Sequence, residues 1–282
     1  MNATQTIDKV EITPKEYARL RAFLYKNVGI ELGENKKPLV CGRLCRRLEA
    51  LNLPNYDAYL DGMERDVPPG ERQHAIDLLT TNETYFYRES RHFDNLLDIA
   101  RQCAKERRGL RIWSAACSSA EEVYTSAIVL QSLVDGGTAL NWEIFGSDIS
   151  ERILETAIRA TYPLSRTTQL PQALLKKYCL KGSGPADGQV LVSKPIRSKV
   201  RFGKINLVEP LPDIGLFDVI FLRNVLIYFD AATKRHVVNS ITTKLAPNGT
   251  LFVGLAESLN GIVSNLVSVA PGMYRLKPVN PS

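Results

Sequence analysis

The sequence of 282 residues contains no tandem repeat, no low-complexity tract and no uninterrupted apolar run as long as a membrane-spanning helix needs. Its N-terminal stretch, MNATQTIDKVEITPKEY, also lacks the basic and apolar regions of a secretory signal. We therefore expect a globular protein of one large or two modest domains, with no direct membrane insertion.

Cysteine and histidine are scarce, with five of the former and three of the latter. The cysteines are odd in number and no two have C-x-x-C spacing, so neither a disulfide framework nor a zinc site is expected. These features predict reduced thiols, a cytoplasmic location and no bound metal. The 36 basic and 30 acidic residues leave a net charge of +6, which by itself indicates no class of partner.

The stretch from Leu110 to Tyr124, LRIWSAACSSAEEVY, joins a short apolar run to a helical pattern through small side chains and two acids. This is the strand, turn and helix that open a nucleotide-binding α/β fold. The small side chains let a ligand approach the backbone, and the amides at the helix start are free to donate hydrogen bonds. The G-x-G-x-x-G pattern of dinucleotide folds is absent, so an ordinary strand–helix turn remains an open alternative.

Two further segments continue the alternation of strand and helix. Trp142 to Phe145 predicts a strand that ends at Asp148, where an acid is placed to accept hydrogen bonds from ribose hydroxyls. Alternatively, Asp148 or Ser150 only caps the next helix. Leu216 to Asn224 is almost wholly apolar, which is typical of a strand buried on both faces. The late segment LVSVAPGMYRL is expected to close the edge of the sheet.

Residues 163 to 205 interrupt this alternation. PQALLKKYCL predicts a short helix, and the glycine-rich stretch from Lys181 to Gly188 predicts a turn. The flanking stretches QVLVS and KVRFGKI suit short antiparallel strands. We therefore predict a small β insertion within the α/β domain.

The region from about residue 12 to 80 has apolar residues at helical spacing, which predicts an all-α N-terminal domain. Arg43, Arg46 and Arg47 fall at i, i+3 and i+4, so they share one helix face. Both a solvated helix face and a docking surface for an anionic partner fit this pattern. The joint that follows, LTTNETYFYRES, fits either a helix cap or a functional segment dense in polar and aromatic groups.

Five blocks of the sequence, in one order along nearly the whole chain, resemble the chemotaxis receptor methyltransferases of the CheR family. WSAACSSAEEVY is similar to W-S-A-A-[AC]-S-T-G-E-E-P-Y, and TTNETYFYRE to T-T-N-x-T-x-F-F-R-E. FDVIFLRNVLIYFD is similar to F-D-x-I-F-C-R-N-V-M-I-Y-F-D, and GSDISERILETAIRATYP and LAPNGTLFVGLAES resemble two further blocks.

The resemblance implies an α/β fold: a Rossmann-like S-adenosylmethionine-dependent methyltransferase domain at residues 109–282, with a small antiparallel β insertion at about 163–205. It further implies an all-α receptor-docking domain at residues 1–80 and, at 81–108, a linker and connecting helix that contribute to the cofactor site. The implied activity is transfer of a methyl group from S-adenosyl-L-methionine to γ-carboxylates of glutamates on the cytoplasmic helices of chemoreceptors, for sensory adaptation. S-adenosyl-L-homocysteine is the implied product.

The residues that match the family's cofactor-contacting positions are Asn82, Thr84, Arg88, Glu122, Asp148, Asn206, Leu207, Asn224 and Val225. Arg88 and Tyr228 match residues near the transferred methyl group, and the helix with Arg43, Arg46 and Arg47 matches the receptor-docking helix.

The β insertion resembles the longer loop of members that bind a short peptide at the receptor's C-terminal end. In this chain the loop contains Gly182, Gly184 and Gly188, and we expect the short strands at Val190–Val192 and Val200–Phe202 to supply an open edge for the peptide.

Two departures from the family pattern leave alternatives open. Ala120 replaces the turn glycine, and Leu255 stands within the block where the family has G-H-S-E. A catalytically weakened, cofactor-binding adaptor in a chemosensory pathway is therefore one alternative, and a nucleic-acid methyltransferase is another. The near-neutral N-terminal region argues against the latter, and we expect no nucleic-acid partner.

Overall fold

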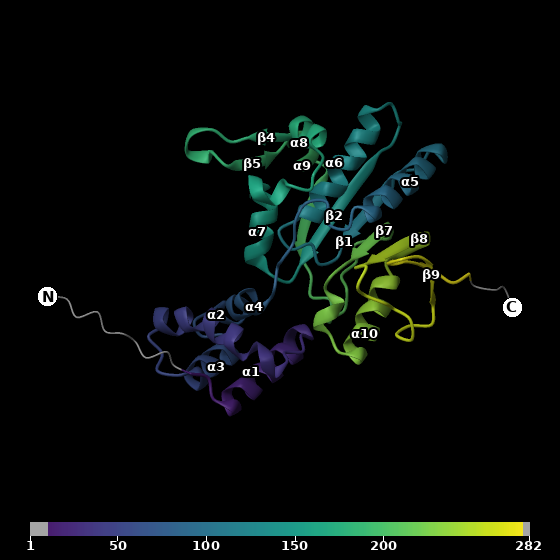
Figure 1. The fold of residues 1–282 in the computed structure, drawn as a ribbon. Coiled ribbons are helices and arrows are strands. Elements are labelled where there is room, and N and C mark those ends of the chain that lie inside the picture. The colour runs from purple at the N-terminus through teal and green to yellow at the C-terminus, as the bar shows by residue number, and fades with distance from the viewer. Residues whose placement is uncertain (1–10, 279–282) are drawn as a thin grey trace. The chain divides into compact units, whose positions relative to one another are not determined.

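The computed structural model describes residues 11–278 and divides the chain into two compact units (Figure 1). One, called here the helical unit, comprises residues up to Thr81 together with Tyr228–Asp230. The other, the sheet unit, comprises Asn82–Ile227 and the chain from Ala231 onwards. Among the described residues, no helix combines the length and the apolar character that crossing a bilayer requires.

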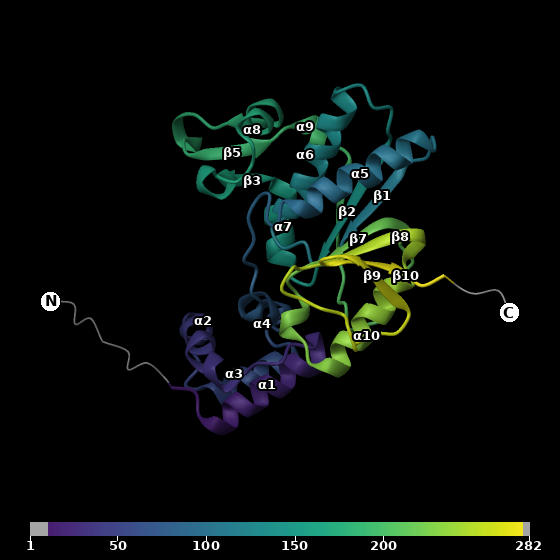
Figure 2. The same ribbon diagram turned by 45° about the vertical axis from the view of Figure 1, so that its right-hand side comes forward.

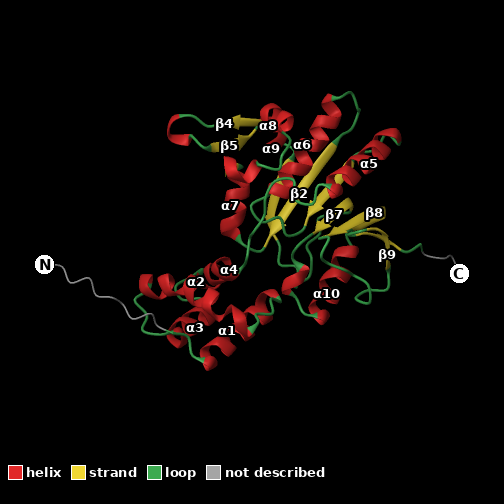
Figure 3. Cartoon of the chain, in the orientation of Figure 1, coloured by secondary structure: helices red, strands yellow, loops and turns green. Residues whose placement is uncertain are grey.

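The helical unit contains no strand between residues 11 and 81, apart from a single bridge between Ile30 and Phe229 (Figure 3). Its helices are α1 (Pro14–Val28), the 3₁₀ helix η1 (Glu34–Lys36), α2 (Lys37–Ala50), α3 (Tyr56–Arg65) and α4 (Glu71–Leu79). Helix α1 begins with a capping box, in which Glu16 N donates to Thr13 Oγ1 (3.2 Å) and Thr13 N donates to the Glu16 carboxylate (2.7 Å). It ends at Gly29, whose φ of 70° is left-handed. The all-α prediction is confirmed here.

The three arginines of α2 have different environments, which the sequence pattern did not distinguish. The Arg47 guanidinium binds the carboxylate of Glu71, which is 1% exposed, and the Tyr59 hydroxyl donates to the same carboxylate (2.8 Å). Arg43 Nη1 donates to the carbonyls of Leu79 and Thr80 (3.0 Å each), at the C-terminal end of α4. Of the three, only Arg46 is exposed. The three arginines lie on one helix face as their spacing predicts, but spacing did not show that Arg43 and Arg47 bind other residues of the unit. The docking role of this face stays a prediction.

The sheet unit is built on a seven-stranded sheet. In spatial order its strands are β6 (Val200–Lys204), β2 (Trp142–Asp148), β1 (Leu110–Ser114), β7 (Phe217–Leu222), β8 (Leu245–Val253), β10 (Met273–Leu276) and β9 (Leu266–Ala270). The first five are parallel to one another, while β10 is antiparallel to both β8 and β9. Strands β9 and β10 lie at one end of the sheet, as predicted for LVSVAPGMYRL.

The direction of the strand order reverses at β1, whose two neighbours are β2 and β7. Ile112 of β1 pairs with Ile144 of β2 and Val219 of β7, and all three side chains are buried. In open α/β sheets, ligands bind at the carboxyl ends of the strands where the order reverses. The fold therefore places a candidate site after β1 and β7.

The helices of the sheet unit are α5 (Arg91–Lys105), α6 (Glu121–Asp135), α7 (Glu151–Arg159), α8 (Gln172–Tyr178), α9 (Lys194–Arg197) and α10 (Ala231–Thr242). Helix α6 packs against α5, α8, α9 and β2, while α10 packs against β8 (Figure 2). Every residue of α6 from Val123 to Leu130 is buried, so this helix is central to the unit's core.

A second, three-stranded antiparallel sheet has the order β3 (Thr161–Pro163), β5 (Gln189–Val192) and β4 (Cys179–Lys181). The antiparallel insertion predicted from the sequence is thus present, but one of its strands was wrongly placed. The stretch around Val200–Phe202 forms β6, which pairs in parallel with β2 in the main sheet. Alternating apolar residues predict a strand without indicating its partner, and β6 completes the crossover that follows β2. Val190–Val192 is also no open edge, because β5 is paired on both sides.

The contrast between Arg47 and Arg46 yields a stability prediction. Arg47→Leu should lower the free energy of unfolding of the helical unit by about 3 kcal/mol, since it leaves the buried Glu71 charge unpaired. Arg46→Leu, the same change at an exposed neighbour, should change it by less than about 0.5 kcal/mol. Hydrogen exchange of the amides of α2 to α4 in the full chain measures both. The double variant Arg47→Leu/Glu71→Leu should recover most of the loss. Equal effects of the two single variants would contradict the structural role of Arg47.

Candidate active site

The turn from Ala115 to Ala120, called here the cofactor turn, joins β1 to α6 in a strained conformation. Ala120 is fully buried and has φ 73° and ψ 18°, and Ser118 has φ 51°. A left-handed conformation disfavours a residue with a Cβ by about 1 kcal/mol, so surrounding contacts must hold the turn. The turn is therefore left-handed even though alanine stands where the family pattern has glycine.

Asp148, at the carboxyl end of β2, braces this turn. Ser118 N donates to Asp148 Oδ2 (2.8 Å), and Ser150 N donates to Oδ1 (3.0 Å). Ser150 caps α7, because its hydroxyl accepts from Ile153 N (3.3 Å). A carboxylate has about four lone-pair sites, so one Asp148 side chain can accept several hydrogen bonds at once.

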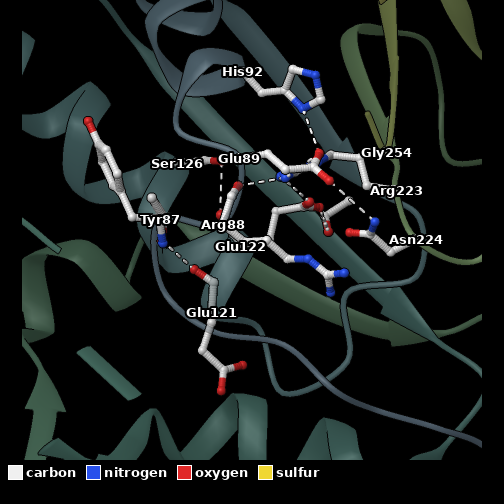
Figure 4. A network of polar contacts seen from close by, with 12 residues as sticks. Tyr87, Arg88, Glu89, His92, Glu121, Glu122, Ser126, Arg223, Asn224 and Gly254 are labelled. Carbon is white, nitrogen blue, oxygen red and sulfur yellow. Dashed lines mark hydrogen bonds and ion pairs between the residues drawn. The ribbon is translucent and has the colours of Figure 1, made fainter. Parts of the chain in front are cut away.

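Arg223 lies at the centre of a buried ion network after β7 (Figure 4). Its side chain is 2% exposed; Nη1 donates to Glu122 Oε2 (2.8 Å) and Nη2 to Glu89 Oε2 (3.0 Å). Nη2 also donates to the Arg88 carbonyl (2.6 Å). Ser114, the last residue of β1, donates its hydroxyl to Glu122 Oε1 (2.7 Å). One guanidinium thus connects three segments that are distant in the sequence.

Glu89 receives further hydrogen bonds from the loops after β7 and β8. Asn224 Nδ2 donates to Oε1 (3.4 Å), and Leu255 N donates to Oε2 (3.2 Å). Burial alone would raise the pKa of Glu89, but the Arg223 guanidinium and these hydrogen bonds outweigh it and hold that pKa below its ordinary value. Glu89 therefore remains a carboxylate at neutral pH.

Glu257 fixes the backbone where β7 and β8 end. Its Oε2 accepts from Asn224 N (2.8 Å) and from Gly254 N (2.7 Å), and Asn224 is left-handed at φ 57°. The other oxygen, Oε1, is buried without a hydrogen-bond partner among the described residues. The site thus contains a buried acceptor whose hydrogen-bonding capacity is unused.

The structure brings most of the predicted cofactor positions to one edge of the main sheet. Asp148 is the last residue of β2, and three other predicted positions follow the carboxyl ends of the neighbouring parallel strands: Glu122 after β1, Asn206 after β6 and Asn224 after β7. Asn206 begins a turn in which Val208 N donates to its Oδ1 (3.3 Å), and the next residue, Leu207, is buried. Val225 follows Asn224 and is half-buried.

The segment with Asn82, Thr84 and Arg88 joins this edge through its backbone. The Asn82 carbonyl accepts from Ser118 Oγ (2.9 Å), and Tyr87 N donates to Thr125 Oγ1 (3.1 Å). No helix starts at Thr81 or Asn82, so the helix-cap interpretation of this joint is wrong; α5 begins only at Arg91. Thr84 is half-buried within the segment.

The two residues matched to the methyl-transfer region differ in placement. Arg88 is half-buried, donates from Nη1 to the Glu83 carbonyl (3.2 Å) and lies over the Tyr85 ring, with Cζ 5.7 Å from its centroid. Tyr228 belongs to the helical unit, where its carbonyl accepts from Glu31 N (2.8 Å). Its role therefore stays a prediction.

Sequence reasoning missed Arg223, Glu89 and Glu257. A signal existed for Arg223, since it is a charged residue directly after a strand that is apolar except for Asp218 near its start. A charge in that position is buried unless the chain turns outward, and a buried charge needs partners. Those partners come from segments far apart in the sequence, so spacing alone did not reveal them.

The residues present fit S-adenosylmethionine. The cofactor turn offers small side chains and a helix start, and Asp148 is a carboxylate at a strand end suited to a ribose diol. Glu122 and the unpartnered Oε1 of Glu257 add acceptors suited to the positive groups of such a ligand. By geometry, the sheet unit is a nucleotide-type cofactor-binding α/β domain.

Comparison with known proteins identifies the class more closely. Residues 82–272 match the family model described as CheR methyltransferase, SAM binding domain, and residues 15–80 match CheR methyltransferase, all-alpha domain. Chemotaxis protein methyltransferase 2 of Pseudomonas aeruginosa is 40% identical over 247 residues, which are 87% of this chain and 87% of that protein. The chemotaxis protein methyltransferase of Salmonella typhimurium is 36% identical over 273 residues, or 96% and 93% of the two chains. That of Borreliella burgdorferi is 34% identical over 274 residues, or 94% and 95%.

The chain belongs to the CheR methyltransferase family, and the resemblance stated from its sequence blocks is confirmed. It is an S-adenosylmethionine-dependent methyltransferase of chemotaxis.

His92 lies beside the ion network and is fully buried. Its Nδ1 is 3.4 Å from Glu89 Oε2, and its ring meets that of Phe252 edge-on with centroids 5.2 Å apart. Burial lowers the pKa of His92 to about 4, and the Arg223 charge adds to this effect against the opposing charge of Glu89. His92 is therefore neutral at neutral pH.

This pKa predicts how the stability of the sheet unit depends on pH. The folded pKa lies below the unfolded one, so unfolding takes up a proton between pH 6.5 and about 4. The stability contribution is complete above pH 6.5, and about 3 kcal/mol is lost as the pH falls through 4. Denaturant titrations followed by tryptophan fluorescence measure this, because both tryptophans, Trp113 and Trp142, lie in the sheet unit.

In His92→Gln the acid-side loss should be smaller by about that amount. His74→Gln, in α4 of the helical unit, is the control for replacing a histidine outside the sheet unit. An unchanged slope in His92→Gln between pH 4 and 6.5 would show that His92 is not the responsible group.

Proposed function

We propose that this chain methylates glutamate γ-carboxylates on the cytoplasmic helices of chemoreceptors, giving glutamyl methyl esters. The observation that carries the proposal is the site edge itself: a left-handed cofactor turn braced by Asp148, beside an ion network centred on Arg223. Family membership and the names of the relatives support the choice of substrate.

Methyl transfer to a glutamate carboxylate needs no general acid or base from the protein. A glutamate side chain has an ordinary pKa near 4.3, so it is already a nucleophilic carboxylate at neutral pH. S-adenosylmethionine, when bound, supplies an electrophilic methyl group on a positively charged sulfur. The chain's own task is to bind, orient and exclude water, and a site fixed before binding serves that task.

Named residues divide this task. We assign Asp148 to accept hydrogen bonds from the ribose and Glu122 to accept them from the methionine part of the cofactor. Arg88 can pair with a carboxylate, either that of the cofactor or that of the substrate glutamate, because a planar guanidinium matches carboxylate geometry. Tyr228 would border the methyl group. We assign Asn82, Thr84, Asn206, Leu207, Asn224 and Val225 to the walls of the cofactor site.

Methyl transfer to receptors is directly testable. Receptor signalling domains incubated with the protein and methyl-labelled S-adenosylmethionine should acquire label that mild alkali releases as methanol, since esters are base-labile. Asp148→Asn should weaken S-adenosylhomocysteine affinity about tenfold by replacing a charged hydrogen bond. Arg88→Ala should lower turnover.

Asp213→Asn, an acid-to-amide change at a side chain that is 98% exposed, serves as the matched control and should keep both affinity and turnover. Alkali-stable label would rule out the ester. Wild-type performance in both Asp148→Asn and Arg88→Ala would show that the site is misplaced.

We further propose that the three-stranded sheet tethers a receptor C-terminal peptide. Its outer strands are β3 and β4, and Leu180 of β4 is 60% exposed. The conformation of the β4–β5 loop requires its glycines. A Cβ on Gly182 would lie 1.9 Å from the Ala186 carbonyl oxygen, and Gly184 and Gly188 have positive φ. This loop and the edge of β4 together support strand addition by a peptide.

A peptide with the C-terminal sequence of a cognate receptor should bind at micromolar strength. Leu180→Glu should weaken that binding about tenfold or more, because it removes apolar contact at the edge strand. Shortening Ser183 to Ala186 should abolish it. Leu216→Glu, at a leucine that is 48% exposed elsewhere in the sheet unit, is the control. Calorimetry measures peptide and S-adenosylhomocysteine binding separately. Unchanged peptide binding in the shortened protein would place the tether elsewhere.

A further inference from the structure

The base of the small sheet makes specific contacts with the cofactor turn. Tyr162 of β3 is 1% exposed, and its hydroxyl donates to the carbonyl of Ser119 (2.6 Å). This bond holds the peptide unit immediately before Ala120. The donor comes from the β insertion and not from the strands that carry the turn.

A buried ion pair adds a second contact. Glu121, the first residue of α6, is fully buried, and its Oε1 accepts from Arg166 Nη1 (2.6 Å). Its Oε2 accepts from Ser119 Oγ (2.6 Å). Arg166 lies in the 3₁₀ helix η2 (Leu164–Thr167), directly after β3. Residues on both sides of Ala120 are therefore fixed by the same short segment of the insertion.

The same segment also holds the chain that carries the predicted cofactor residues Asn82 to Arg88. Phe86 N donates to the Arg166 carbonyl (3.3 Å), and the Phe86 ring meets the Tyr162 ring edge-on with centroids 5.0 Å apart. Phe86 is fully buried. Tyr162 and Arg166 thus join the two backbone segments on which the proposed cofactor site depends.

The left-handed Ala120 explains why the turn needs such contacts. Without external bonds, an alanine prefers negative φ by roughly fivefold or more, so the free turn would spend most of its time in another conformation. A ligand that needs a minor conformation binds more weakly in proportion to its population. Fixing Ser119 and Glu121 removes that penalty before the ligand arrives.

We propose that Tyr162 and Arg166 are positioning residues that hold the cofactor turn in its left-handed, binding-competent conformation. They act through Ser119 and Glu121, with no need to touch the ligand. The proposal rests on the proposed function only in taking this turn as the cofactor's binding place. It makes the β insertion part of the cofactor site, in addition to any tethering role.

Tyr162→Phe is the first test, because it removes one hydroxyl and keeps the ring packing. We expect S-adenosylhomocysteine affinity, measured by calorimetry, to fall about three- to tenfold for the loss of one buried hydrogen bond. KM for S-adenosylmethionine should rise, while kcat at saturation stays within twofold. Tyr178→Phe is the matched control, since its hydroxyl donates to Asp135 Oδ2 (2.8 Å), away from the turn, and affinity should be unchanged.

Arg166 is tested by replacing it together with Glu121, so that both members of the pair become neutral. Arg166→Met alone would leave the buried Glu121 charge without its partner. Arg166→Met/Glu121→Gln should fold, weaken S-adenosylhomocysteine binding and speed hydrogen exchange of the amides from 117 to 122. Arg166→Lys, which keeps a positive charge, should bind S-adenosylhomocysteine more tightly than the neutral pair does.

Ala120→Gly separates positioning from general stability. Glycine accepts positive φ without penalty, so in this background the effect of Tyr162→Phe on affinity should shrink by up to about fivefold. If Tyr162 had only a general structural role, Tyr162→Phe would lower the affinity by the same factor in the wild-type and Ala120→Gly proteins. Wild-type affinity and exchange in both Tyr162→Phe and the neutral pair would overturn the proposal. If the wild-type protein fails to bind S-adenosylhomocysteine, the proposed function fails instead.

Discussion

A guanidinium is stable away from water only where opposite charges and acceptors surround it, and Arg223 meets that condition through two segments that are distant in the sequence. Glu89 comes from the joint before α5, Glu122 from the first turn of α6, and the Arg88 carbonyl from the same joint. Since Arg223 directly follows β7, the network ties these segments to the point where the strand order reverses. The shape of the site edge follows from satisfying one buried charge.

Several residues near Arg223 have strained backbone conformations. Five of the non-glycine residues with positive φ among those the structure describes lie at the site: Tyr87, Glu89, Ser118, Ala120 and Asn224. Strained conformations persist only where neighbouring contacts determine them, and hydrogen bonds from or to side chains act at each of these segments. These contacts fix the backbone of the site before any ligand binds. A fixed site suits a reaction that depends on orientation more than on proton transfer.

The three arginines of α2 share one helix face but have different surroundings. Arg47 stabilises the interior through Glu71, and Arg43 satisfies carbonyls at the end of α4, just before the joint that begins at Asn82. Arg46 is the exposed member of the three. Arginines at helical spacing can therefore hold helices together, and the proposed docking role depends mainly on Arg46.

The sequence by itself determined that an all-α part precedes an α/β part, the main strands and helices, the presence of a β insertion and the family, because hydrophobic period and ordered motifs are local properties of the chain. It also placed Asp148 at a strand end. Tertiary structure alone decided that β6 joins the main sheet, that Glu121 pairs with Arg166, and that Arg223 collects Glu89 and Glu122. A side chain's period indicates whether it is buried, whereas its partner depends on which distant segment the fold brings beside it.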